Sequence, residues 1–470
     1  MAPENLRFGG GLSQTFVHPV VAVAMVIAVL LLLFGSRKSA IGAFLAAGIL
    51  IGMGQGIVLG PFHFLMQRVL ILFGCVRVLR QRSSFEDGVF GGRMKGLDTA
   101  FVLLTLVSAI ATVLLWQTMA AVINQLGLII TMLGAFVVLR FLIRDEEDVE
   151  TAIRALAYIA AVLAVAMVVE ELTGKNLYGY IGGRLIPDMR GGRYRAMAGF
   201  SHEILAGTFG AIVLPLFVWL WWKGKKVLGL VGVVSSLVIV FTSNSSTSLM
   251  GLGGALIGLA MWPLRKQMRL VRWGIVGMVV SLHMVMKAPV WALIGRFDMG
   301  GSSGFHRYQL VDQCIRHFGD WWLVGVKDYP SWGWDMWDLA NQYVGIADTT
   351  GLLPLIFFIA IIVYGFKYIG RARKAVEGDK QREKLYWALG ATMFANVVAF
   401  FGISYFDQTQ NAWYATLAII CASTGPFLAK TAEAGLQPAY PVVPATTREG
   451  ALAKDRKGPS RWPLGSERIR

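Results

Sequence analysis

The pattern of hydrophobic and polar positions divides most of the chain into long apolar stretches separated by short polar connections. Because an α-helix needs about 20 apolar residues to cross the hydrocarbon layer of a membrane, we read these stretches as candidate spans. None alternates with the period of two that a barrel strand requires. The sequence therefore predicts an all-α fold, a polytopic transmembrane helical bundle of about 12–13 spans. The stretches lie near residues 15–35, 40–59, 62–79, 98–117, 121–142, 152–172, 203–222, 227–244, 246–263, 273–291, 351–369, 385–403 and 412–429.

The second and third stretches are the weakest spans. Glycines recur at every fourth residue there and, in a continuous helix, would share one face and permit close packing. They are Gly48, Gly52, Gly56 and Gly60. We expect two crossing helices, with a re-entrant hairpin as the alternative that stays open.

Composition and charge add an orientation. Of the 470 residues, 56% are hydrophobic and only 15% are charged, yet the formal net charge is +16. Soluble domains carry about a quarter charged residues, so a soluble enzyme is excluded. The basic connections fall on one side if the spans alternate, and positive loops stay in the cytoplasm. We therefore expect a cytoplasmic C-terminus and, with an odd number of spans, an outward N-terminus.

This topology divides the chain into six parts. In order, we expect N-terminal membrane helices, a basic outer loop, further membrane helices, a large outer loop, C-terminal membrane helices and a disordered cytoplasmic tail. The corresponding ranges are 1–172, 173–202, 203–291, 292–350, 351–429 and 430–470.

Two outer segments carry positive charge against the insertion rule. Arg193 and Arg195 stand just before the seventh stretch, after the pair Gly191-Gly192. A guanidinium is a rigid fork of donors that matches phosphate oxygens, and glycine lets the backbone approach a ligand. We interpret this first segment as a binding site for a phosphate-bearing ligand, with contact to lipid headgroups as the simpler alternative.

The second outer segment, about sixty residues long, combines tryptophans with carboxylates and basic residues. Aromatic rings next to hydrogen-bonding groups can stack on sugar rings and bind their hydroxyls; an interfacial tryptophan belt is the simpler account. Apolar residues recur at helical spacing from His306 to Phe318, which predicts a short amphipathic helix. The six tryptophans are Trp291, Trp321, Trp322, Trp332, Trp334 and Trp337.

Several classes of protein lack their motifs here. The three cysteines form no CxxC pair, no HExxH metal motif occurs, and no P-loop lysine motif is present. We therefore expect no metal site, no cofactor and no nucleic-acid partner.

Within this context the second segment resembles the O-antigen ligase/polymerase family. The similarity covers about residues 190–370 and includes the earlier piece GRYRAMAGFSHEILAG. The matching elements are Arg296, His306-Arg307-Tyr308, Gly325, Trp332-Gly333, Asp338, Asn341-Gln342-Tyr343 and Gly351-Leu352-Leu353.

The resemblance implies a GT-C-like helical bundle with one large periplasmic loop in the bacterial inner membrane. It implies transfer of an undecaprenyl-diphosphate-linked oligosaccharide to a glycan or lipid acceptor during surface-polysaccharide or exopolysaccharide synthesis, in contact with membrane lipid and other polysaccharide-assembly proteins. Many ligases carry a His-Asn pair in this loop, whereas this chain has Ala340-Asn341. Ligase and polymerase both stay open.

Such a transfer needs cations for the leaving diphosphate and a proton acceptor for the attacking hydroxyl. For the base we favour Asp338, with His306 second. Asn341 and Tyr343 would orient hydroxyls, and Trp332 and Trp334 would hold sugar rings. The expected diphosphate ligands are Arg193, Arg195, Arg296 and Arg307.

We expect Arg195→Ala and Arg307→Ala to abolish transfer in a protein that still folds. Two alternative functions stay open. One is a flippase or exporter of lipid-linked oligosaccharides, which requires charged residues along a path through the spans. The other is a non-catalytic membrane subunit of a polysaccharide export machine.

Overall fold

A helix occupies each of the thirteen apolar stretches, entirely or in part. The structure is a computed structural model and describes residues 14–52, 54–60, 62–81, 89–90, 94–296 and 303–436. Of the expected disordered tail, 430–470, the structure describes residues 430–436, which are helical and not disordered, and the rest lies outside the described residues. The helices are α2 (Pro19–Phe34), α3 (Arg37–Leu50), α4 (Met66–Gln81), α5 (Gly96–Trp116), α6 (Met119–Ile129), α7 (Ala135–Leu142), α8 (Glu146–Thr173), α9 (Glu203–Trp222), α10 (Lys226–Thr242), α11 (Ser246–Ala260), α12 (Met268–Val285), α13 (Ser303–Arg316), α14 (Phe318–Trp321), α15 (Gln342–Thr350), α16 (Leu352–Ala375), α17 (Lys380–Ala399) and α18 (Asp407–Leu436).

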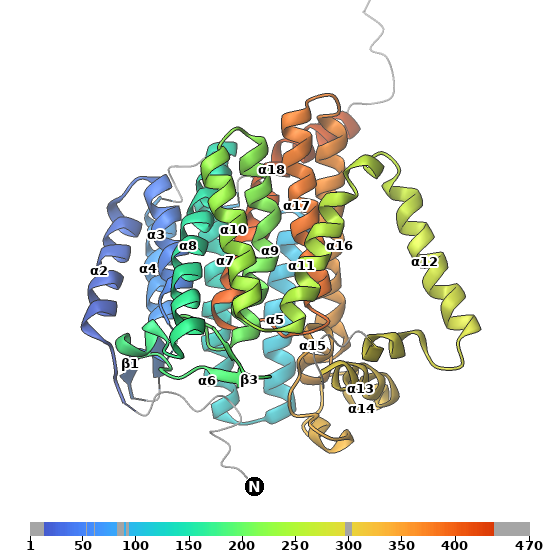
Figure 1. Ribbon diagram of the computed structural model, residues 1–470, viewed down its shortest axis with the longest axis horizontal. Coiled ribbons are helices and arrows are strands. Elements are labelled where there is room, and N and C mark those ends of the chain that lie inside the picture. Colours follow the sequence, from blue (N-terminus) through green and yellow to red (C-terminus); the bar gives the residue numbers. More distant parts are fainter. Residues whose placement is uncertain are drawn as a thin grey trace, which may run out of the picture. The chain divides into compact units, whose positions relative to one another are not determined.

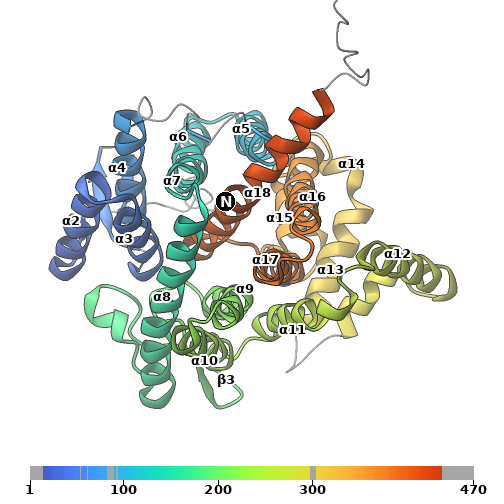
Figure 2. The ribbon, with the colours of Figure 1, turned by 90° about the horizontal axis from the view of Figure 1, so that it is seen from above.

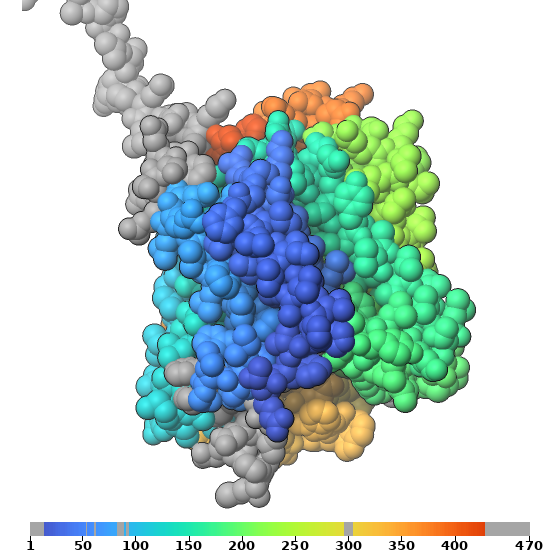
Figure 3. Space-filling model, turned by 90° about the vertical axis from the view of Figure 1, so that its left-hand side faces the viewer, coloured from blue at the N-terminus to red at the C-terminus, as the bar shows by residue number. Residues whose placement is uncertain are grey.

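Among the described residues, six helical segments are long and apolar enough to cross a membrane. They are α5, α6 to α7, α8, α9, α12 and α16, and a π-helical turn (Ile130–Gly134) joins α6 to α7. The helices α2, α10 and α11 are apolar but shorter. Helix α2 runs along the middle of the face seen in Figure 3 (dark blue), and residues such as Val23, Val26 and Leu30 are exposed. The chain is a multi-pass membrane protein that is mostly helical, as predicted.

The second and third stretches differ from the expectation of two complete helices. Helix α3 ends at Leu50, and an antiparallel hairpin of β1 (Gly56–Leu59) and β2 (Phe62–Leu65) precedes α4. Each glycine costs a helix about 1 kcal/mol relative to alanine, and Gly54 and Gly60 adopt φ angles of +91° and +60°. The glycines after Leu50 therefore end the helix and build a turn, so the predicted helical glycine face is wrong.

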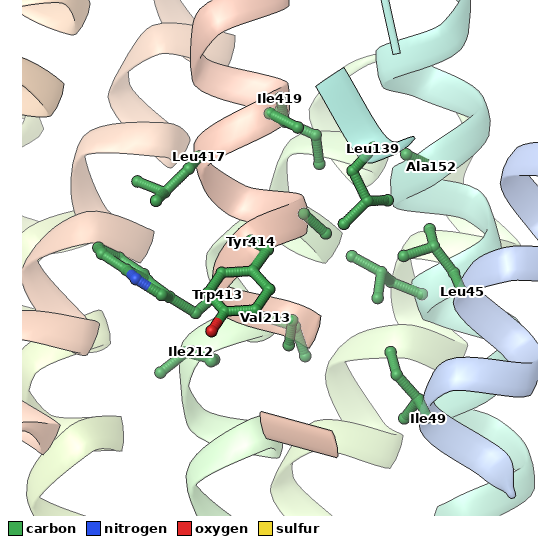
Figure 4. Packing of buried hydrophobic residues seen from close by; sticks show 14 of the residues in the cluster. Leu45, Ile49, Leu139, Ala152, Ile212, Val213, Trp413, Tyr414, Leu417 and Ile419 are labelled. Carbon is green, nitrogen blue, oxygen red and sulfur yellow. The ribbon is translucent and has the colours of Figure 1, made fainter. Parts of the chain in front are cut away.

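The middle of the bundle is formed around α9 and α18. Figure 2 looks along the helices and shows α18 running between α8 and α16, with α9 and α17 beside it. Figure 4 shows Trp413 and Tyr414 of α18 packing towards Ile212 and Val213 of α9. Small residues permit this density: a Cβ on Gly229 of α10 would lie 2.6 Å from the backbone nitrogen of Trp221.

Ion pairs connect the polar connections at one end of the bundle, which we call the basic end. Arg37, the first residue of α3, pairs with Asp148 of α8 at 3.0 Å, and Lys223 after α9 pairs with Glu150 at 2.7 Å. Another pair joins the connection after α11 to α17. Three of the basic connections thus form ion pairs at one end of the bundle.

The opposite end holds the remaining non-spanning elements, and we call it the loop end. It contains β1 and β2, a second hairpin of β3 (Asp188–Arg190) and β4 (Arg193–Arg195), and α13 to α15 (Figure 1, bottom). The amphipathic helix predicted from His306 to Phe318 is confirmed as α13. Helix α12 stands beside the bundle without a buried residue and leads the chain to this end.

Candidate functional site

Both predicted outer segments meet at one turn of the loop end, the connection between α10 and α11. The side-chain amide of Asn244 in this turn donates to the backbone carbonyl of Arg190 at 3.2 Å. Nη2 of Arg307 donates to the hydroxyl of Thr247 at 2.7 Å. Two regions more than a hundred residues apart therefore contact the same polar run, residues 242–248, which includes this turn and the first residues of α11. This convergence defines the candidate site.

The first segment reaches the site through the β3–β4 hairpin. Its two turn residues, Gly191 and Gly192, have φ angles of +56° and +75°, as a type I′ hairpin turn requires. The glycine pair thus builds the hairpin that presents Arg193 and Arg195. Arg193 lies at the surface and pairs with Glu171 at the end of α8, so its charge is already balanced.

Arg195 forms an ion pair with Glu203, the first residue of α9. The side chain of Arg195 is only 13% exposed and that of Glu203 only 2%, which makes this a buried pair. His202 caps the helix, because its Nδ1 accepts from the backbone nitrogen of Ile204. Among the described residues, Nε of Arg195 has no hydrogen-bond partner. Arg195 therefore keeps one donor for a ligand while Glu203 neutralises its charge.

The second segment reaches the site through α13. Arg307 is only 4% exposed, and the Thr247 hydroxyl that it contacts donates in turn to the backbone carbonyl of Gly402 at 3.1 Å. Thr247 lies in the first turn of α11, where free backbone N–H groups attract negative charge. Arg307 thus brings a guanidinium to a helix N-terminus and ties α13 to the bundle.

His306 and Asp338 lie next to each other. Nε2 of His306 is 2.9 Å from the backbone carbonyl of Asp338 and must carry the proton to donate to it. Asp338 keeps contact with solvent, yet burial of its carboxyl raises its pKa, against the opposing effects of His306 and His202.

Asn341, which is buried, and Tyr343, which is partly buried, support α15. The side-chain oxygen of Asn341 caps the helix by accepting from the backbone nitrogens of Tyr343 and Val344. The Tyr343 hydroxyl donates to the carbonyl of Val397 at 3.2 Å, and its ring packs on aromatic residues such as Phe401. Both side chains position the end of the large loop.

The remaining predicted residues lie further out. Trp332 stacks on His317 with ring centroids 4.4 Å apart, and Trp334 is 76% exposed. The backbone of Arg296 ends a 3-10 turn, but its side chain lies outside the described residues.

Unusual backbone conformations gather at the loop end. The non-glycine residues with positive φ that the structure describes are all found here, and Ala198 is the least expected among them because its side chain offers no local hydrogen bond. Such residues cost of order 1–3 kcal/mol each and concentrate at functional sites. They are Gln117, Ala198, Asn244, Asp335 and Asp407.

Sequence reasoning missed two components of the site. Glu203 is absent from the residues expected at the site, although a buried carboxylate needs a cation. The run from Thr242 to Ser248 consists entirely of hydroxyl and amide side chains between two apolar helices. That density of polar groups, most of them buried, is the signal that could have identified this turn.

Across the described ranges, no three His, Cys, Asp or Glu side chains are grouped so that they could hold a metal ion. In comparison with known proteins, no family model and no curated protein matches the chain. Function is therefore inferred from the residues of the loop end.

Proposed function

We propose that this protein is a membrane glycosyltransferase that moves an undecaprenyl-diphosphate-linked glycan onto an acceptor hydroxyl. The supporting observation is the convergence of two arginine-bearing segments on one polar turn, through Arg307–Thr247 and Asn244–Arg190. A lipid diphosphate is an anion carried at a membrane surface, and the end of a membrane bundle that gathers arginines and a helix N-terminus is chemically suited to it.

In the proposed reaction, the acceptor oxygen attacks the anomeric carbon of the lipid-linked sugar. The bond from that carbon to the diphosphate oxygen breaks, and undecaprenyl diphosphate leaves with the electron pair. Arg195 through Nε, Arg307 and the first turn of α11 stabilise the leaving charge. The Asp338 carboxylate takes the proton of the acceptor hydroxyl, and His306 holds the Asp338 backbone in place.

The other predicted residues take supporting roles. Asn341 and Tyr343 fix α15 beneath the site. Trp334 offers an exposed ring for sugars of a longer glycan. Arg193 lies at the outer edge, where it has to exchange Glu171 for a phosphate.

The proposal includes the wider topology. The loop end faces the periplasm, the basic end and C-terminus face the cytoplasm, and the bundle has about 12–13 spans of GT-C-like type in the bacterial inner membrane. An exporter is less well supported, because the charges of Asp98 and Arg140 inside the spans pair with each other at 2.9 Å and so neutralise each other.

The test is a transfer assay with the full-length protein in nanodiscs and a synthetic undecaprenyl-diphosphate tetrasaccharide. We expect longer or acceptor-linked glycans together with released undecaprenyl diphosphate, and loss of both in Arg307→Ala. Arg272→Ala, an exposed arginine on α12, is the matched control and should retain transfer. Movement of the intact donor across a vesicle membrane without bond cleavage, or no product at all, would overturn the proposal.

A further inference from the structure

A cavity of about 280 Å³ adjoins the candidate site. It lies between the turn after α3, a 3-10 turn (Leu177–Ile181) and the chain that enters α9, and one of its lining residues is Ser201. Ser201 directly precedes His202 and Glu203, and Glu203 pairs with Arg195 of the candidate site. Small-molecule pockets span roughly 300–1,000 Å³, so this cavity accommodates a single ring rather than a chain.

The lining of this cavity suits a neutral ligand rich in hydroxyl groups. Five of the thirteen lining residues are glycines, which leave peptide N–H and C=O groups accessible. Tyr178 and Phe200 add aromatic surface, and Arg184 is the single charged lining residue. Because Arg184 pairs with Asp188, the cavity carries no uncompensated charge. Backbone donors and acceptors next to aromatic rings are the groups that bind a sugar.

Buried side chains hold the wall of this cavity in position. One carboxylate oxygen of Glu170 accepts from the backbone nitrogens of Met197 and Ala198 at 3.1 and 2.8 Å. On the other side, Nε2 of Gln408 donates to the carbonyl of Gly199. Ala198 is held at a φ of +49°. A wall that is fixed by buried polar groups and contains a strained residue is preorganised for a ligand.

We propose that this cavity binds a neutral sugar ring of the acceptor. The inference rests on the proposed function, because it is the acceptor that must reach the site, and the lining residue Ser201 leads directly into His202 and Glu203. The diphosphate leaving group binds outside this cavity, at Arg195, Arg307 and the first turn of α11.

A pair of glycine substitutions tests this proposal. At Gly52, a Cβ would come no closer than 3.5 Å to the nearest atom, the carbonyl oxygen of Gly199. The backbone therefore tolerates a Cβ in Gly52→Leu, and the rest of the leucine side chain fills the cavity. At Gly274 on α12, a Cβ would meet nothing within 4 Å, so Gly274→Leu is the matched control. Gly52→Ala fills less of the cavity and serves if the leucine variant does not fold.

Binding is measured by saturation-transfer NMR on full-length protein in nanodiscs with a panel of neutral monosaccharides. We expect at least one sugar of the panel to bind the wild type and Gly274→Leu equally well. Its dissociation constant should rise at least tenfold in Gly52→Leu and by a smaller factor in Gly52→Ala. Equal binding in all variants, or no binding of any sugar to the wild type, would overturn the proposal.

The transfer assay separates this proposal from the proposed function. Transfer with a raised acceptor KM and little change in kcat in Gly52→Leu supports both. Sugar binding that is lost in Gly52→Leu, in a protein with no transfer activity, supports the sugar site and refutes the glycosyltransferase. Normal acceptor KM in an active Gly52→Leu protein refutes the acceptor subsite and leaves the glycosyltransferase standing.

Discussion

Replacing Arg195 by alanine should destabilise the protein as well as inactivate it. The structure pairs Arg195 with Glu203, and both side chains are buried. Removing one partner of a buried ion pair costs about 3–5 kcal/mol, because the other charge is left without compensation. Glu203 is in the first turn of α9, where the helix N-terminus stabilises the negative charge of Glu203 by up to about 1 kcal/mol. We therefore expect the free energy of unfolding to fall by about 2–4 kcal/mol.

The partner substitution distinguishes this cause from a general packing loss. Glu203→Gln removes the stranded charge with little change in shape, so the double variant Arg195→Ala/Glu203→Gln should recover most of the lost stability. Transfer should stay absent in the double variant, because Arg195 no longer meets the diphosphate. The sequence alone had suggested that Arg195→Ala folds normally, and the buried pair changes that expectation.

The assay is unfolding by SDS in mixed micelles, followed by tryptophan fluorescence, for the wild type, both single variants and the double variant. This set forms a double-mutant cycle that isolates the interaction between the two side chains. An Arg195→Ala cost below about 0.5 kcal/mol, the range of exposed ion pairs, would refute the reasoning. So would a double variant no more stable than Arg195→Ala.

Three further predictions concern the site and the bundle. Arg307→Ala should lower kcat by about 10²–10³, the scale of one lost charge-stabilising donor, and Thr247→Val, which removes its hydrogen-bond acceptor, should lower kcat less. The transfer rate should fall as pH drops through the pKa of Asp338, which burial raises, because the base acts only when deprotonated; Asp338→Asn should lose this acidic limb and about 10²–10⁴ in rate. Gly229→Ala should cost about 1–3 kcal/mol of stability through overpacking against α9, whereas Gly253→Ala, with nothing within 4 Å of its Cβ, should be neutral in the same unfolding assay.

The helices were largely predictable because hydropathy is a local property. Every apolar stretch contains a helix, and the period of Leu310, Val311, Cys314 and Ile315 identified α13. The exception is instructive: after Leu50 the chain stays apolar but becomes rich in glycine, and backbone preference overrides hydropathy there.

The site was predictable in its residue types but not in its pairings. Arginines in two outer segments pointed to the loop end, yet no local pattern indicates that Arg195 meets Glu203 or that Arg307 meets Thr247. Such contacts depend on how distant helices pack. The sequence likewise does not indicate that the hydroxyl of Tyr343 donates to the carbonyl of Val397 on α17.

Photo-crosslinking tests most directly the central claim that both segments form one lipid-diphosphate site. An undecaprenyl-diphosphate oligosaccharide with a photoreactive group beside the diphosphate is bound to the full-length protein in nanodiscs, and labelled peptides are mapped by mass spectrometry. We predict labelling in both residues 184–203 and residues 303–322, displaced by unlabelled donor but not by undecaprenol. Labelling confined to the basic end, in residues 35–38 or 261–272, would contradict the account.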